Sequence, residues 1–185
     1  MPTRCPPAGL KTMRILLTKT QIADKVQELG AQISEDYQDK NPILIGLLKG
    51  SVVFLSDLMR TLTIPHTIDF IRASSYGAGM TSSGQVRVTS MDVDVENRHV
   101  LLIEDIIDSG VTLQYLKEVL IDRKPASLCV CALLDKPTSR RTSEKVDYCG
   151  FTIPDVFVVG YGLDWNEQYR HLPYVAVVEE QKNGP

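Results

Sequence analysis

Two carboxylates follow directly on an apolar run in the stretch VLLIEDIIDSGVTL, which spans residues 100–113. The run at 100–103 is typical of a buried strand, and Glu104 and Asp105 stand at its carboxyl end. Ionised carboxylates only accept hydrogen bonds, so this pair suits the hydroxyl groups of a ribose or a hydrated magnesium ion. An ordinary solvated turn would not explain two acids at the end of a core strand.

A potential anion-binding turn begins a few residues later. It consists of Asp108, Ser109, Gly110, Val111 and Thr112. The carboxylate and hydroxyl side chains are expected to cap a helix at 112–121, and the glycine allows a sharp turn. The backbone N–H groups would line a concave site at the positive end of the helix dipole. Together with the two acids before it, this cradle predicts a site for ribose 5-phosphate.

Strands and helices are expected to alternate along the rest of the chain. Helical spacing of apolar residues predicts a helix through Ile22–Ile33, capped by Thr18 or Thr20. A second helix is expected at 52–62. Strands are expected at 42–48, 66–74, 85–91, 100–103, 126–135, 155–162 and 174–180, the last of them near an edge.

Several of these strands are apolar throughout, which indicates an α/β fold with a mainly parallel, twisted sheet and helices on both faces. Ligands bind such sheets beyond the carboxyl ends of the strands. Lys49, Glu104, Lys136 and Asp164 all follow an expected strand at that end.

Length and charge restrict the classes of function. The 185 residues, 43% of them hydrophobic, predict one domain at 18–185 after a loose N-terminal leader at 1–17. A net charge of −3 argues against a nucleic-acid partner. No apolar run reaches the roughly 18 residues of a membrane span, so no membrane association is expected.

The four cysteines form no CxxC pair, which argues against a zinc site. Cys129 and Cys131 alternate in an apolar run, so both are expected on one side of a buried strand. Reduced core thiols of this kind predict a cytoplasmic protein.

Several motifs resemble those of type I phosphoribosyltransferases. The stretch at 100–113 is similar to the ribose-phosphate signature of that family. The hypoxanthine-guanine branch is indicated by similarity to its lysine segment and purine-binding hood. The further similar segments are LLKGS at 47–51, IDFIRASSY at 68–76, LLDK at 133–136 and IPDVFVVGYGLDWNEQYRHLPYV at 153–175. The resemblance runs from about residue 19 to 179, with the hood at about 150–180.

The resemblance implies transfer of a 5-phosphoribosyl group from phosphoribosyl pyrophosphate to hypoxanthine, guanine or both. The products would be IMP or GMP and pyrophosphate, the cofactor Mg²⁺, and the assembly a homodimer or homotetramer. A xanthine-preferring transferase and a non-catalytic nucleotide-sensing regulator of the same fold stay open as alternatives. Asp108 together with Asp164 favours catalysis over regulation.

Residue roles follow from the same resemblance. Asp108 matches the general base that acts at purine N7. The ribose-phosphate contacts are Glu104, Asp105, Asp108, Ser109, Gly110, Val111 and Thr112. The pyrophosphate contacts are Lys49, Gly50, Ser75, Tyr76 and Arg170, with a cis peptide expected before the lysine. The purine contacts are Lys136, Phe157, Val158 and Asp164, and the metal ligands are Glu104, Asp105 and Asp164.

Two of these expectations have a physical basis of their own. The ammonium of Lys136 carries donors only, so it favours a 6-oxo over a 6-amino purine. The segment Ser74–Gln85 is rich in glycine, serine and threonine, and we expect it to be a mobile lid over the pyrophosphate.

Overall fold

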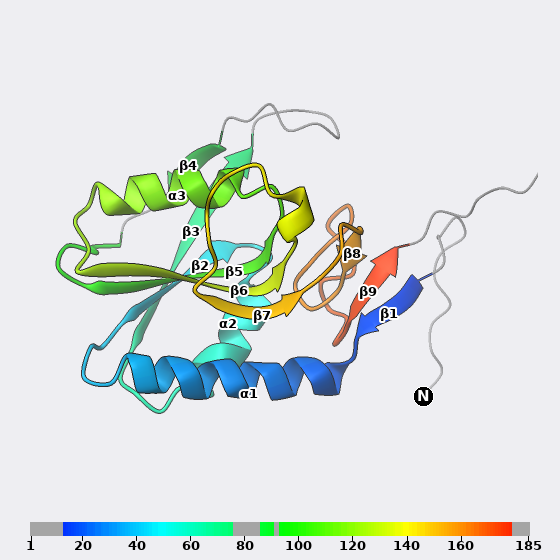
Figure 1. The fold of residues 1–185 in the computed structure, drawn as a ribbon, viewed down its shortest axis with the longest axis horizontal. Helices are drawn as coiled ribbons and strands as arrows, with labels where there is room; N and C mark the ends of the chain where they lie inside the picture. The colour runs from blue at the N-terminus through cyan, green and yellow to red at the C-terminus, as the bar shows by residue number, and fades with distance from the viewer. Residues whose placement is uncertain (1–12, 76–85, 91–92, 179–185) are drawn as a thin grey trace, which may run out of the picture.

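A six-stranded sheet forms the centre of the protein, in the order β4-β3-β2-β5-β6-β7 (Figure 1). The computed structural model describes residues 13–75, 86–90 and 93–178. Neighbouring strands from β3 to β7 are parallel, and only β4 runs antiparallel, at the edge. The strands are β2 (Ile43–Leu48), β3 (Thr67–Ser75), β4 (Val86–Ser90), β5 (His99–Ile107), β6 (Ser127–Asp135) and β7 (Tyr148–Thr152). The predicted α/β class with a mainly parallel sheet is therefore confirmed.

Helices cover both faces of this sheet, as predicted. Figure 1 shows α1 (Lys19–Asp36) and α2 (Val52–Met59) on one side and α3 (Val111–Ile121) on the other. The first helix begins with a capping box, because Thr18 Oγ1 accepts from the Gln21 N–H while Gln21 Oε1 accepts from the Thr18 N–H. A short 3-10 turn, η1 (Pro137–Ser139), follows β6.

Alternate residues of the central strands fill two separate cores. In β5, Leu101 and Ile103 pack on the α1–α2 side, and Val100 and Leu102 pack on the α3 side. This two-sided burial explains the continuous apolar runs of the sequence. Cys129 and Cys131 both lie on the α1–α2 side, as predicted, and both are free thiols, as is Cys149.

A small antiparallel sheet of order β1-β9-β8 forms the hood at one end of the molecule (Figure 1). Its strands are β1 (Met13–Leu17), β8 (Val158–Val159) and β9 (Val175–Val178). The prediction that residues 13–17 belong to a loose leader is wrong, because Met13–Leu17 pairs with β9. Residues 1–12 lie outside the described residues.

Two expectations about the C-terminal strands also need correction. The run at 155–162 yields only the two residues of β8, and β9 is the central strand of the hood sheet. Both segments satisfy the apolar pattern of a strand, but that pattern does not specify which sheet a strand joins. The sequence reading also missed β7, whose polar and aromatic residues form no apolar run. Within the described ranges, no helix combines the length and apolar character needed to cross a membrane.

Candidate active site

Three adjacent strands bring the predicted polar residues to one edge of the sheet. β2 pairs in parallel with β5, and β5 with β6, in a register that sets Gly46 beside Ile103 and Ile107 beside Asp135. Lys49 directly follows β2, Lys136 directly follows β6, and Glu104 lies in the carboxyl-terminal half of β5, so all three lie at the carboxyl edge of the sheet. This arrangement is the usual ligand side of such a sheet.

The carboxyl end of β5 and the turn that follows it line a cavity of about 180 Å³. Its walls come from residues 104–110, with Leu47, Thr112 and Leu113. Gly110 is the N-cap residue of α3 and has φ +80°, and a Cβ there would lie 2.4 Å from Thr142 Oγ1. Only glycine combines that backbone conformation with so close a neighbour.

The N-cap residue of α3 is Gly110, so Asp108, Ser109 and Thr112 do not occupy the expected cap position, although Ser109 Oγ accepts from the Val111 N–H at 3.5 Å. The left-handed glycine lets the chain turn sharply into the helix, as the sequence predicted. Behind the turn, the Arg141 N–H donates to the Ser109 carbonyl at 2.8 Å. Thr112 and Leu113 line the cavity and precede the first intrahelical bond of α3, from the Gln114 N–H to the Gly110 carbonyl at 2.9 Å. A helix start placed beside a cavity in this way is a common arrangement for binding a phosphate.

The two acids of β5 are held in an unfavourable environment for charge. Glu104 is only 3% exposed, and burial, reinforced by the neighbouring Asp105, raises its pKa well above the usual range. Burial also raises the pKa of Asp105 to about 6, with Arg170 lowering it and Asp164 raising it. A cation bound here would offset this desolvation, so the pair has the character of a cation or hydroxyl site.

The loop after β2 is packed tightly between β5 and the hood. A Cβ on Gly50 would lie 1.7 Å from Asp105 Oδ2, and a Cβ on Gly162 would lie 2.1 Å from the Gly50 carbonyl oxygen. The peptide between Leu48 and Lys49 is cis, as the resemblance implied. The predicted pyrophosphate loop therefore contacts both the acidic strand end and the hood.

Lys136 and Asp108 form an ion pair beside the cavity. Lys136 is 5% exposed, and its Nζ lies 3.2 Å from Asp108 Oδ2 and 3.6 Å from Asp155 Oδ1. The structure thus brings the predicted base and the predicted purine donor together. Asp155 was missed by the sequence reading, because an exposed acid after a proline carries no signal of its own.

Phe157 comes directly before β8 in the hood segment. Phe157 is 54% exposed, whereas the neighbouring Val158 is buried in β8. A large aromatic side chain left in solvent favours a stacking surface over a core role.

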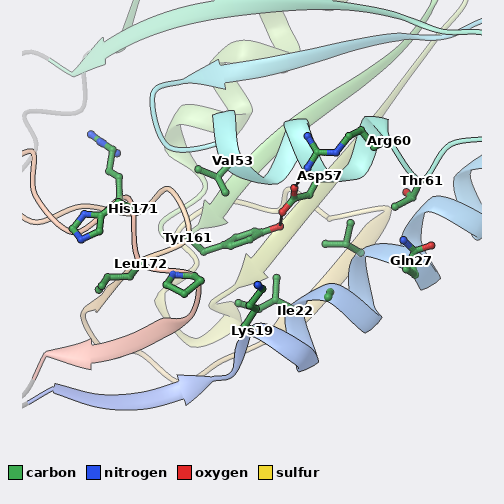
Figure 2. A pocket seen from close by; sticks show the side chains of 14 residues that line it. Lys19, Ile22, Gln27, Val53, Asp57, Arg60, Thr61, Tyr161, His171 and Leu172 are labelled. Carbon is green, nitrogen blue, oxygen red and sulfur yellow. Dashed lines mark hydrogen bonds and ion pairs between the residues drawn. The ribbon is translucent and has the colours of Figure 1, made fainter. Parts of the chain in front are cut away.

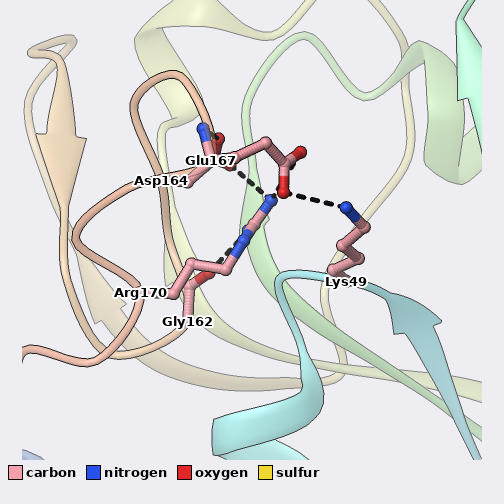
Figure 3. Close-up of polar contacts among 5 residues, drawn as sticks. All are labelled: Lys49, Gly162, Asp164, Glu167 and Arg170. Carbon is pink, nitrogen blue, oxygen red and sulfur yellow. Dashed lines mark hydrogen bonds and ion pairs between the residues drawn. The ribbon is translucent and has the colours of Figure 1, made fainter.

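Polar contacts join the hood to the loop after β2 (Figure 3). Lys49 Nζ lies 2.8 Å from Glu167 Oε2, and Arg170 Nη2 lies 2.8 Å from Asp164 Oδ1. Arg170 also donates to the Gly162 carbonyl at 2.7 Å. The predicted pyrophosphate residues Lys49 and Arg170 therefore lie near each other, and Glu167, which the sequence reading missed, contacts both.

A second cavity of about 460 Å³ lies behind the hood, between α1 and α2 (Figure 2). Tyr161 crosses it, and its hydroxyl donates to Asp57 Oδ2 of α2 at 2.6 Å. Burial, together with this bond, raises the pKa of Tyr161. The contact anchors the start of the hood segment that carries Gly162 and Arg170.

Part of the predicted pyrophosphate site falls on residues that the structure does not describe. Ser75 ends β3, but its side chain and the whole of residues 76–85, including Tyr76, lie outside the described residues. The expected lid therefore stays a prediction.

The acids of the site suit magnesium in number and kind. In the part of the chain that the structure describes, no group of three or more His, Cys, Asp and Glu side chains could hold a metal ion alone. Magnesium usually takes one or two protein carboxylates and completes its shell with water and phosphate oxygens. Glu104 and Asp105 fit that pattern as a pair, and Asp164, which lies close enough to raise the Asp105 pKa, is a separate single carboxylate.

Known proteins of one family are similar to this chain over nearly its whole length. The phosphoribosyl transferase domain model matches residues 14–166. A hypoxanthine phosphoribosyltransferase of Salmonella typhimurium is 46% identical over 170 residues, covering 90% of this chain and 96% of the relative. A hypoxanthine-guanine phosphoribosyltransferase of Bacillus subtilis is 47% identical over 167 residues, covering 90% and 93%. The crystal structure of a Staphylococcus aureus hypoxanthine phosphoribosyltransferase superposes with a TM-score of 0.87 at 43% identity, covering 93% of this chain and 94% of that one.

Proposed function

The chain belongs to the phosphoribosyl transferase family, and from that membership we propose that it transfers a 5-phosphoribosyl group to hypoxanthine, guanine or both. The donor is phosphoribosyl pyrophosphate, and the products are IMP or GMP and pyrophosphate. One observation carries the proposal: the 3.2 Å contact of Asp108 with Lys136 beside the cavity lined by the phosphate cradle. A purine and a ribose 5-phosphate must be held side by side for this reaction.

The pair matches two neighbouring atoms on one edge of a 6-oxopurine. Lys136 donates to O6, and Asp108 accepts the proton of N7. As N9 forms its bond to the anomeric carbon, the bond from that carbon to pyrophosphate breaks and the N7 proton passes to Asp108. Positioned proton transfer of this kind is worth roughly 10²–10⁴-fold in rate. Phe157 stacks on the purine ring, and the backbone of Val158 meets its edge.

The leaving group is held on the other side of the ribose. Lys49, the N–H of Gly50 and Arg170 bind pyrophosphate, and residues 108–112 bind the 5-phosphate. Glu104 and Asp105 accept from the ribose hydroxyls. One magnesium ion would be held by Glu104 and Asp105 on the ribose side, and a second by Asp164 on the far side of the leaving group. Bound there, they would neutralise charge on the departing pyrophosphate.

Neither alternative function gains support from the relatives. The three named above are hypoxanthine or hypoxanthine-guanine transferases, not xanthine-preferring enzymes or regulators.

The test is release of pyrophosphate with magnesium and each of hypoxanthine, guanine, xanthine and adenine. Hypoxanthine or guanine should support release, and adenine should not, because its 6-amino group cannot accept from Lys136. Faster release with xanthine would favour the xanthine-preferring alternative. No release with any purine would refute the proposal.

We further propose a cytoplasmic homodimer or homotetramer acting on small molecules. The free thiols of Cys129, Cys131 and Cys149 support a reducing compartment. Sedimentation equilibrium would distinguish the two assemblies, and a purely monomeric species would contradict both.

A further inference from the structure

Glu167 stands at a position of its turn where glycine would be sterically easier. Trp165 and Gln168 exchange backbone hydrogen bonds of 3.2 and 3.0 Å, so the two residues between them form a tight hairpin turn. Asn166 has φ 51° and Glu167 has φ 62°. Positive φ at both central positions defines a type I′ turn, for which the preferred pair is asparagine followed by glycine. A glutamate in the second position bears a steric penalty that glycine would not.

The side chain of this glutamate reaches both cations of the predicted pyrophosphate site (Figure 3). Glu167 Oε2 lies 2.8 Å from Lys49 Nζ, and Oε1 lies 3.5 Å from Arg170 Nη2. The Lys49 hydrogen bond holds the pKa of Glu167 below its usual value. The carboxylate is therefore the anion that these two cations share across the boundary between sheet and hood.

The turn does not need this carboxylate for its shape. The Glu167 N–H donates to Asp164 Oδ2 at 2.9 Å, and Arg170 is fixed by the Gly162 carbonyl and by Asp164. The Glu167 side chain itself is 65% exposed and buries little apolar surface. A purely structural role of Glu167 would thus explain its backbone contacts but not the two ion pairs of its side chain.

We propose that Glu167 sets the affinity for pyrophosphate by competing with it for Lys49 and Arg170. The inference rests on the proposed function, in which these two residues bind the leaving group. Pyrophosphate and the Glu167 carboxylate are both anions and both seek the same donors, so each weakens the binding of the other. Glu167 is in this sense a positioning residue, which acts through Lys49 and Arg170 and not on the reacting atoms.

The competition has a direct consequence for turnover. Pyrophosphate must leave after each reaction, and a protein carboxylate that recaptures the two cations favours its departure. Removing the carboxylate should therefore tighten binding of the product pyrophosphate. Exposed ion pairs of this kind correspond to a change of about two- to fivefold in affinity.

Calorimetric titration of magnesium pyrophosphate into wild type, Glu167→Gln and Glu167→Gly tests the proposal. Both variants should bind pyrophosphate about two- to fivefold more tightly, and the gain should shrink as ionic strength rises. Binding of IMP, which does not use Lys49 or Arg170, should not change. Glu35→Gln, which removes the same charge from an exposed position on α1, is the matched control and should bind like wild type.

The outcomes separate this inference from the function on which it rests. Unchanged or weaker pyrophosphate binding in Glu167→Gln would overturn the competition. An equal gain in Glu35→Gln would also overturn it, because net charge alone would then explain the effect. Wild-type protein that releases no pyrophosphate in the purine assay would instead refute the proposed function.

Discussion

Replacing Asp105 by asparagine should make the protein more stable in the absence of magnesium. Asparagine has the same shape, so it keeps the close contact with Gly50 and can still accept from the Ile106 N–H. What it removes is a carboxylate whose ionised form is disfavoured by burial. The difference in unfolding free energy between this variant and wild type therefore measures how much stability the folded protein loses by burying the ionised acid.

The magnitude follows from the pKa. Burial raises the pKa of Asp105 from an ordinary 3.8 to about 6, a difference of about 2.2. At about 1.4 kcal/mol per pKa unit, the ionised group costs the folded state up to about 3 kcal/mol. The folded protein binds the proton more tightly than the unfolded chain, so this loss is absent below about pH 4. It grows as the pH rises towards 6 and is complete at pH 7.

Urea unfolding in a chelating buffer at pH 4 and pH 7 measures the effect. Asp105→Asn should gain up to about 3 kcal/mol over wild type at pH 7 and little at pH 4. Asp24→Asn, which loses the same charge on the exposed face of α1, is the control and should show no such pH dependence. Magnesium with pyrophosphate should stabilise wild type more than the variant. Equal stability of Asp105→Asn and wild type at pH 7 would refute the reasoning.

Three further predictions concern the reaction. Asp108→Asn should lower turnover by roughly 10²–10⁴-fold while IMP binding survives, since an amide cannot accept the N7 proton; steady-state rates within a few-fold of wild type would contradict this. Lys136→Ala should weaken purine binding by about 1.5–3 kcal/mol and phosphoribosyl pyrophosphate binding less; equal losses in calorimetry would disprove the assignment. Asp164→Asn should raise the magnesium concentration for half-maximal rate and weaken pyrophosphate binding; a titration that superimposes on wild type would leave Asp164 as a turn residue.

Local chemistry made much of the fold and site predictable. The capping box of Thr18 and Gln21, the alternating burial of β5 and the turn at Gly110 all depend on residues within a few positions of each other. Apolar runs bounded by polar strand ends likewise predicted the parallel sheet and the edge on which Lys49, Glu104 and Lys136 meet. Such features are visible in a sequence because neighbouring residues alone produce them.

Other features depend on segments that are far apart in the chain. The burial of Glu104 and the raised pKa of Asp105 arise from the segments that pack around the end of β5. The two residues by themselves therefore do not reveal either property. The same holds for β1 and β9, whose pairing joins the two ends of the described chain. Glu167 contacts a lysine 118 positions away, and no pattern in the sequence links the two. Contacts of this kind follow from three-dimensional packing, because an exposed acid can pair with any cation that the fold brings within reach.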